Sequence, residues 1–522
     1  MSRQKTLVLV AMIFAVAMMF IDQTIVAIAI PELERDLSLS ATGGQWIVNG
    51  YLLALSALFA FGGRLTDVLG HRRTVLIGVV GFATASALCG ATPTGDVGEA
   101  WMIVFRVIQG GFAALLFPAA LAIVVGAFDV RERGKALAIF FAVTGALTSV
   151  GPIAGGYLTE WTWRSIFWIN VPVAIIAVVL TLRARPEDKR QPAPIDYRGA
   201  VLVCLGMGLA VLGLQQSAVW GWDSPATWLC IAAGIVLMIV FVRVELRTEH
   251  PLIRLRIFAD RGFSVDNAVL MLMSACFVPL FFFGSMYSQI ALGYDASNAG
   301  LYLLIFFGGF AAASQLGGRL LDARGARIPV VVGCLVAAVG FFLWAQQLTD
   351  LNLDAQWPWI VVAGVGIGLI LSPVSTDALN RAAQSAYGEV TGITQTVRNF
   401  GSSLGLALLG TILILRNKAN IEETLGEAGA PKAVADRVAE ALSGTGGGDA
   451  AAFASGAGEH AHLFEAVQHD FAASTQTVFY VMAAIMAVAF VIALVGMPGG
   501  VAPQVQAARD EDAEAGRPGA AV

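Results

Sequence analysis

The sequence predicts an all-α polytopic membrane protein, on the basis of its composition, its charge and the length of its apolar stretches. Of the 522 residues, 57% are hydrophobic and 13% are charged, whereas soluble domains carry about 25% charged residues. The mean hydropathy is +0.74. The apolar residues gather in stretches of the roughly 20 residues that a helix needs to cross a bilayer. This composition excludes a set of soluble domains, a disordered chain and a disulfide scaffold, and the net charge of -5 argues against a nucleic-acid partner.

Fourteen apolar stretches are predicted to be membrane-spanning helices. The first resembles a signal peptide, because Arg3 and Lys5 precede it. It is too long for that role and carries Asp22 and Gln23, so we interpret it as a retained helix. In chain order the predicted spans are 7–30, 45–63, 74–92, 100–123, 136–158, 166–183, 199–217, 226–242, 263–288, 298–317, 329–347, 358–380, 389–415 and 475–497.

The distribution of Lys and Arg predicts the orientation of the chain. With the N-terminus in the cytoplasm and the spans alternating, most of the 32 basic residues fall in cytoplasmic segments, as the positive-inside rule requires. Both termini are therefore expected in the cytoplasm. Only five of the 32 basic residues are Lys, and this bias, with the abundant Ala and Gly, suggests a bacterium of high GC content. The expected location is its cytoplasmic membrane.

A repeated segment divides the chain into two halves. Residues 62–72 recur at 317–327, and both copies leave a span on the cytoplasmic side. Two six-helix halves related by duplication are typical of transporters, with the substrate path between them. We expect an N-terminal half at 1–184, two inserted helices with linkers at 185–262, and a C-terminal half at 263–497. The last contains a long extracytoplasmic loop at 416–474, and a disordered cytoplasmic tail follows at 498–522.

The repeated turn is the first candidate site. Glycines permit a tight turn between two helices, and an acid there can accept a hydrogen bond from a helix N-terminus or an Arg. The alternative is a plain, positively charged turn. The residues concerned are Gly63, Asp67, Gly70, Arg72 and Arg73 in the first copy, and Asp322 and Gly325 in the second.

The second candidate site lies within the membrane, where an acidic side chain is costly and indicates a function. Asp22 lies in the first span, and Arg106 and Gln109 lie in the fourth. At 1.5 Å per residue, Asp22 lies about 6 Å and Arg106 about 7 Å on the outer side of the midplane. Two interpretations stay open. A proton or a cationic substrate competes for Asp22, or the two residues form a static ion pair that orients the helices.

The fifth span supplies a third candidate site, and three ionisable residues are secondary candidates. A proline kinks a helix, and glycines let another helix approach closely. Asp266 and Asp377 lie near the inner ends of their spans, which suits snorkelling to the interface, and Arg398 lies deeper and is a candidate to pair with one of them. The fifth-span residues are Gly151, Pro152, Gly155 and Gly156.

Together these motifs resemble those of the major facilitator superfamily, and within it the fourteen-span drug:proton antiporters of the multidrug efflux type. The likeness covers nearly the whole chain. It implies the major facilitator fold, with two six-helix halves plus two inserted helices. It also implies that the repeated turn is a cytoplasmic latch, that Asp22 and Arg106 lie side by side along a central cavity, and that the kink at Pro152 marks an antiporter.

The resemblance implies a proton-coupled antiporter that exports lipophilic, often cationic drugs or toxic compounds by alternating access. A phosphate-binding loop is not found, since Gly134-Lys135 is followed by Ala136. We find no metal constellation or nucleophile triad, and we expect no enzyme activity and no cofactor, with the proton gradient as the energy source. The expected partners are the lipid bilayer, a lipophilic small molecule and protons, for a monomer that binds no nucleic acid. The alternatives are a dedicated exporter of one self-made metabolite or lipid, and a membrane sensor without transport.

Overall fold

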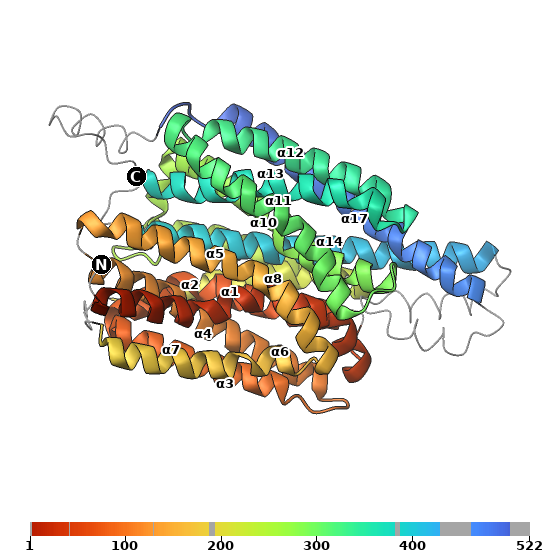
Figure 1. Ribbon diagram of the computed structural model, residues 1–522, viewed down its shortest axis with the longest axis horizontal. Helices are drawn as coiled ribbons and strands as arrows, with labels where there is room; N and C mark the ends of the chain where they lie inside the picture. The colour runs from red at the N-terminus through yellow and green to blue at the C-terminus, as the bar shows by residue number, and fades with distance from the viewer. Residues whose placement is uncertain are drawn as a thin grey trace.

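The computed structural model describes residues 3–40, 42–128, 130–186, 194–381, 387–427 and 461–501. In these residues the chain is a bundle of long helices (Figure 1). The elements in order are α1 (Arg3–Leu37), α2 (Gly43–Leu69), α3 (His71–Gly90), α4 (Gly98–Ala127), α5 (Val130–Trp161), α6 (Ser165–Trp168), α7 (Asn170–Ala184), α8 (Tyr197–Trp220), α9 (Pro225–Glu245), η1 (Leu255–Ala259), α10 (Arg261–Ile290), α11 (Ala296–Arg324), α12 (Arg327–Gln347), η2 (Leu348–Asp350), α13 (Leu353–Asn380), α14 (Tyr387–Glu427) and α17 (Ala461–Gly496).

Every predicted span overlaps a helical segment of the described chain. Thirteen segments are long and apolar enough to cross a membrane, and α6 and α7 together make one of them. The remaining span corresponds to α5, a helix of 32 residues. The predicted fold class, an all-α polytopic membrane protein, is confirmed. The helices extend beyond the apolar stretches, because a helix continues through the headgroup region after its apolar residues end.

The predicted loop at 416–474 is wrong at both of its ends. α14 continues to Glu427 and α17 begins at Ala461, so helix occupies part of this region. The two extensions pack together, since Asn420 Nδ2 donates to Ser474 Oγ at 3.0 Å. Residues 428–460 of the predicted loop and residues 502–522 of the predicted tail lie outside the described residues.

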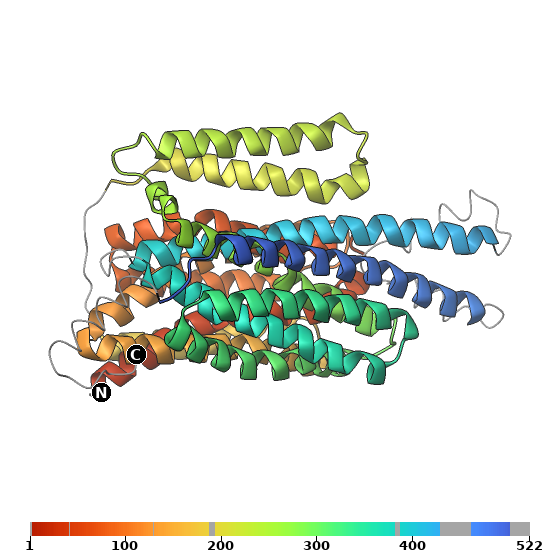
Figure 2. The same ribbon diagram turned by 90° about the horizontal axis from the view of Figure 1, so that it is seen from above.

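The helices form two groups with a hairpin beside them. α1 begins and α17 ends at the same end of the bundle (Figure 1), which we call the proximal end, and the opposite end is the distal end. We call α1–α7 the N-terminal half and α10–α17 the C-terminal half. α8 and α9 form a hairpin along one side (Figure 2), with α8 against α2 and α14. The exact domain boundaries stay a prediction.

Local sequence determines where helices begin and end. The Asp295 side chain accepts a hydrogen bond from the backbone N–H of Asn298 at 2.7 Å and so caps α11. α2 and α11 both end at glycines with positive φ, 98° at Gly70 and 83° at Gly325. Side chains rarely adopt this conformation. The repeated turn therefore needs glycine at this position in both halves.

Candidate functional site

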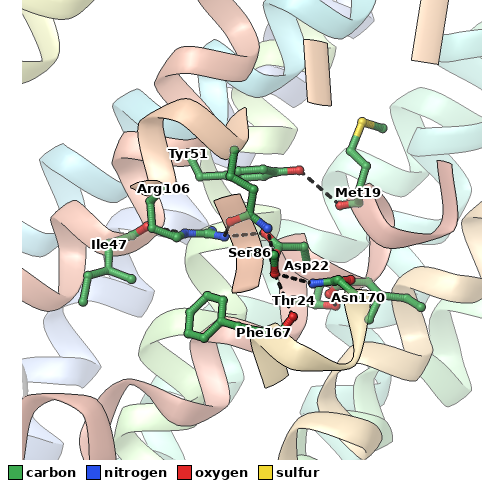
Figure 3. Close-up of polar contacts among 11 residues, drawn as sticks. Met19, Asp22, Thr24, Ile47, Tyr51, Ser86, Arg106, Phe167 and Asn170 are labelled. Atoms are coloured by element: carbon green, nitrogen blue, oxygen red, sulfur yellow. Dashed lines mark hydrogen bonds and ion pairs between the residues drawn. The ribbon is translucent and has the colours of Figure 1, made fainter. Parts of the chain in front are cut away.

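Asp22, Arg106 and Gln109 form one hydrogen-bonded cluster (Figure 3). Arg106 Nη1 lies 2.6 Å from Asp22 Oδ2 and 2.7 Å from Gln109 Oε1, and Gln109 Nε2 donates to Asp22 Oδ1 at 3.0 Å. All three side chains are buried. Arg106 and Gln109 lie one turn apart on α4, so both reach Asp22 on α1. The structure thus joins residues that the sequence places at one depth.

The guanidinium of Arg106 is fixed on its other sides as well. Its Nε donates to the Ile47 carbonyl at 2.9 Å, and its Cζ lies 4.4 Å from the ring centroid of Tyr51. The Phe167 ring centroid is 5.9 Å away, and the Phe167 carbonyl accepts from Ser86 Oγ at 2.8 Å (Figure 3). A cation over aromatic faces is stabilised by the ring quadrupole. Arg106 is therefore held by α1, α2 and α6 together.

The cluster lies within the N-terminal half, which differs from the position along a central cavity that the resemblance implies. The partners of Asp22 and Arg106 come from α1, α2, α4 and α6. A buried ion pair is stable only when further hydrogen bonds satisfy its atoms, and here both carboxylate oxygens accept one. In this conformation Arg106 and Gln109 occupy both carboxylate oxygens of Asp22, so a cationic cargo would have to displace them to bind there.

Pro152 connects α5 to α1 through a backbone carbonyl. Proline has no N–H, so the carbonyl of Thr148, four residues earlier, loses its donor within the helix. Thr24 Oγ1 supplies a donor from α1 at 2.9 Å. A Cβ at Gly151 would overlap Thr24 Oγ1, and a Cβ at Gly155 would come within 3.0 Å of the Ile25 carbonyl. The motif thus makes α1 and α5 one closely packed unit.

Pro152→Ala should abolish export while leaving the protein inserted in the membrane. Alanine restores the backbone donor to Thr148, which then no longer needs Thr24, and α5 straightens. The measurement is cargo export by membrane vesicles, with the amount of inserted protein determined on the same vesicles. Full activity of the variant would show that the kink has no mechanistic role.

The opposite face of the same motif contacts the C-terminal half. A Cβ at Gly156 would lie 2.7 Å from the Ala296 carbonyl, and a Cβ at Gly300 would overlap the Pro152 carbonyl. Both contacts join α5 to the first turns of α11, at the distal end. Glycines at such positions allow two helix backbones to approach closely. This contact, which we call the α5–α11 seam, closes one side of the distal end.

A second seam joins α2 to α14. Ser403 Oγ donates to Asn49 Oδ1, and Ser56 Oγ donates to the Thr396 carbonyl at 3.0 Å. Asn49 Nδ2 also donates to Gln215 of α8 at 2.6 Å, so the inserted hairpin takes part in this α2–α14 seam. Among the described residues, these polar contacts run from the distal end to the middle of α2. The two halves are therefore closed against each other distally.

The repeated turn lies at the proximal end, away from both seams. Asp67 Oδ1 lies 3.6 Å from His71 Nε2, one turn later at the start of α3. The Asp67 side chain is 41% exposed, and its described ionic contact stays within the N-terminal half. A latch between the halves is thus not engaged at Asp67 in this conformation. Its role stays a prediction.

Asp67→Asn should lower the turnover of transport and leave cargo affinity unchanged. The amide keeps the shape and loses the charge, and the turn is far from the path between the halves. The checks are equilibrium cargo binding and export rate, with the reactivity of single cysteines at each end as a record of which end is open. Lost binding without a change in that reactivity would contradict the assignment.

Asp266 and Asp377 form an acidic pair around one arginine, and the prediction that they snorkel to the interface is wrong. Both are at most 1% exposed. Arg381 Nε lies 2.7 Å from Asp377 Oδ2 and 3.5 Å from Asp266 Oδ2, and Arg381 Nη1 lies 3.7 Å from Asp260 Oδ1. Arg381 is not among the residues predicted from the sequence, although its position four residues after Asp377 is a recognisable signal. Two buried carboxylates that share one guanidinium would be neutralised by a single proton.

Arg398 pairs with neither acid, so the suggested partnership is wrong. Arg381 already occupies the space between Asp266 and Asp377. The Arg398 guanidinium instead faces the other half of the protein, with Cζ 5.9 Å from the ring centroid of Phe20 on α1. No ion pair of Arg398 is found among the described residues.

The arrangement of two halves, two seams and intramembrane charges agrees with a known family. The sequence profile of the Major Facilitator Superfamily matches residues 12–406. This chain belongs to that superfamily. As a major facilitator protein with many apolar helices, it is a multi-pass protein of the bacterial cell membrane.

Several relatives of this major facilitator protein have names that refer to export or resistance. The tetracenomycin C resistance and export protein of Streptomyces glaucescens is 34% identical over 83% of this chain and 80% of its own length. The puromycin resistance protein of Streptomyces alboniger is 34% identical, over 77% and 81%. The multidrug resistance protein Stp of Mycobacterium tuberculosis is 30% identical, over 82% and 79%.

Solved structures agree with the fold. A bacterial homologue of the human lysosomal transporter Spinster has a TM-score of 0.60 at 17% identity, covering 95% of this chain and 99% of that one. A D-xylose-proton symporter has a TM-score of 0.56 at 12% identity, covering 78% and 90%. At these identities the likeness establishes the fold of the major facilitator protein and nothing about its cargo.

Proposed function

We propose that this protein is a proton-coupled antiporter that exports lipophilic drugs or antibiotics by alternating access. The observation that carries the proposal is the buried Asp22–Arg106 pair inside a major facilitator fold. Charges within membrane helices are costly and are retained for ion or substrate movement. The relatives named for tetracenomycin C, puromycin and multidrug resistance support export as the direction.

The distal closure supports an inward-facing state. The positive-inside pattern of the sequence predicts that the proximal end lies in the cytoplasm; with this orientation the α5–α11 and α2–α14 seams close the extracellular side. In this state the Asp22 carboxylate accepts hydrogen bonds from Arg106 and Gln109. These donors favour the ionised form, against the burial that favours the protonated form, and we assign this state to the step at which the proton has left and cargo loads from the cytoplasm.

The outward-facing state must then supply the proton. When the seams separate, α1 and α5 move as one unit because of the Thr24–Thr148 hydrogen bond. Separation of Asp22 from Arg106 removes the interactions that favour the carboxylate, so burial then favours its protonated form. The Asp266–Asp377 pair is a second group that could hold a proton, near the cytoplasmic end of the C-terminal half.

Export of one self-made compound is the second candidate function. Two relatives have names that each refer to a single compound, tetracenomycin C and puromycin. A drug exporter and a dedicated exporter differ in the breadth of cargo, not in the coupling. Competition by structurally unrelated compounds for export of one probe distinguishes them.

The test of the proposal is efflux of a fluorescent lipophilic dye from energised cells that express the protein. Efflux should stop when an uncoupler collapses the proton gradient, and it should reappear in vesicles when a pH gradient alone is imposed. Efflux that continues after the gradient is lost would contradict proton coupling. A lack of efflux for every dye and antibiotic tried would contradict broad export.

A further inference from the structure

Among the described residues, Arg398 is an intramembrane cation that the proposed mechanism does not use. It is half-buried on α14, and its guanidinium lies over Phe20 of the opposite half. Arg106 and Arg381, by contrast, each lie within 2.7 Å of a carboxylate oxygen. An unpaired guanidinium within the membrane carries a large cost. A bound anion would stabilise the Arg398 guanidinium, and the described residues do not provide one.

Two buried polar side chains on the same two helices, α1 and α14, also lack a hydrogen-bond partner. Gln23 lies on α1 one turn from Phe20, is 6% exposed, and its Nε2 has no hydrogen-bond partner. Thr391 lies two turns before Arg398 on α14, is 4% exposed, and its hydroxyl has no partner either. Buried donors are normally satisfied. Three donor groups, one on α1 and two on α14, therefore share the same deficiency, and each would be satisfied by an acceptor.

The depth of Arg398 along the bundle axis fits a cargo site that is reached from the proximal end. Arg398 precedes Ser403, which is part of the α2–α14 seam, by five residues. At 1.5 Å per residue it lies about 7 Å on the proximal side of that contact. The ring of Phe20 packs against Phe117 with centroids 5.8 Å apart, so it offers an aromatic face backed by the N-terminal half. An aromatic wall beside a cation suits an aromatic molecule that carries an acidic group.

We propose that the cargo carries an anionic group, a carboxylate or an acidic phenolate, which Arg398 binds between the two halves. This inference rests on the proposed export function and specifies its substrate class. It differs from the often cationic cargo that the family resemblance implies. The acids in the membrane are already engaged, Asp22 by Arg106 and Asp266 and Asp377 by Arg381. Among the described intramembrane groups, Arg398 is therefore a cation without a carboxylate partner.

The test uses three probes that share one fluorophore and differ in charge: pyrenebutyrate, its neutral amide and its trimethylammonium analogue. Binding to the purified full-length protein should be strongest for pyrenebutyrate. Arg398→Gln should weaken pyrenebutyrate binding by about 30-fold or more, the usual range when one member of a buried charge pair is removed. Binding of the neutral amide should stay within about twofold, and Arg398→Lys should retain most of the preference for the anion.

The matched control is Arg243→Gln, which removes the same charge at an exposed position of α9 and should change no binding constant. Equal loss for all three probes in Arg398→Gln, or no preference for the anion in the unaltered protein, would overturn the inference. The relative affinity of the three probes is measured first on the unaltered protein, so a folding defect of a variant cannot account for a missing preference for the anion. If vesicles export the three probes equally, export stands and the anion site fails. If the anion binds preferentially but no probe is exported, the proposed function fails instead.

Discussion

Asp22→Asn should abolish proton-driven export and remove the proton release that accompanies cargo binding. The amide cannot carry the proton, and the loss of charge leaves Arg106 without its counter-ion. An unpaired buried charge costs about 3–5 kcal/mol, so the single variant is also expected to lose stability. The double variant Asp22→Asn/Arg106→Gln removes both charges and avoids this cost. It should fold and still fail to couple export to protons.

The measurement is proton release from purified protein in detergent on addition of cargo, at several pH values. Asp36→Asn is the matched control, because it makes the same change on α1 in an exposed ion pair with Arg164. Arg106→Lys should rescue partly, since it keeps the charge without the planar fork. If Asp22→Asn releases as many protons as the unaltered protein, coupling does not depend on Asp22. The Asp266–Asp377 pair would then be the site to replace.

Gly300→Val should shift the protein toward the state in which the distal end is open. The added side chain overlaps the Pro152 carbonyl across the α5–α11 seam. Overpacking of this kind costs about 1–3 kcal/mol, which corresponds to about 5–150-fold in the balance between two states. The overlap exists only while the seam is closed, so the open state carries no such cost. Export should fall because the inward-facing state is rarely reached.

Gly308→Val is the control for this prediction. Gly308 lies on the same helix, and a Cβ there meets no atom within 4 Å. The measurement is labelling of a single cysteine at the distal end by an impermeant reagent, in cells. Labelling should rise for Gly300→Val and not for Gly308→Val. Unchanged labelling with normal export would show that the seam tolerates the bulk and does not govern the transition.

The intramembrane cluster could be predicted from sequence because helix geometry is regular. A fixed rise per residue places Asp22 and Arg106 at one depth, and a spacing of three places Gln109 beside Arg106. The burial of this cluster within one half could not be predicted, because it depends on how α2 and α6 pack around it. Depth along a helix follows from residue number, whereas direction around the bundle does not.

The Asp266–Asp377 pair also could not be predicted from sequence, for the same reason. Asp266 and Asp377 lie on helices far apart in sequence, and only the packing of α10 against α13 brings them to one guanidinium. The helical extensions past 416 have no continuous apolar stretch, since the buried Ile421 and Leu425 are separated by polar residues, and polar contacts such as that between Asn420 and Ser474 also join them. Tertiary contacts stabilise helix there where hydropathy gives no signal.

The inserted hairpin covers one of the two seams from the lipid and leaves the other uncovered. α8 covers the α2–α14 seam and bonds to it, through Gln215 to Asn49 and through Thr411 Oγ1 to the Leu214 carbonyl at 2.8 Å. Within the described chain, no inserted helix covers the α5–α11 seam on the other side of the bundle. A lipophilic molecule in the bilayer therefore meets the hairpin at the α2–α14 seam, and meets α5 and α11 directly at the other seam. The duplication makes the two halves alike, whereas the inserted hairpin makes the two lipid-facing sides of the transporter different.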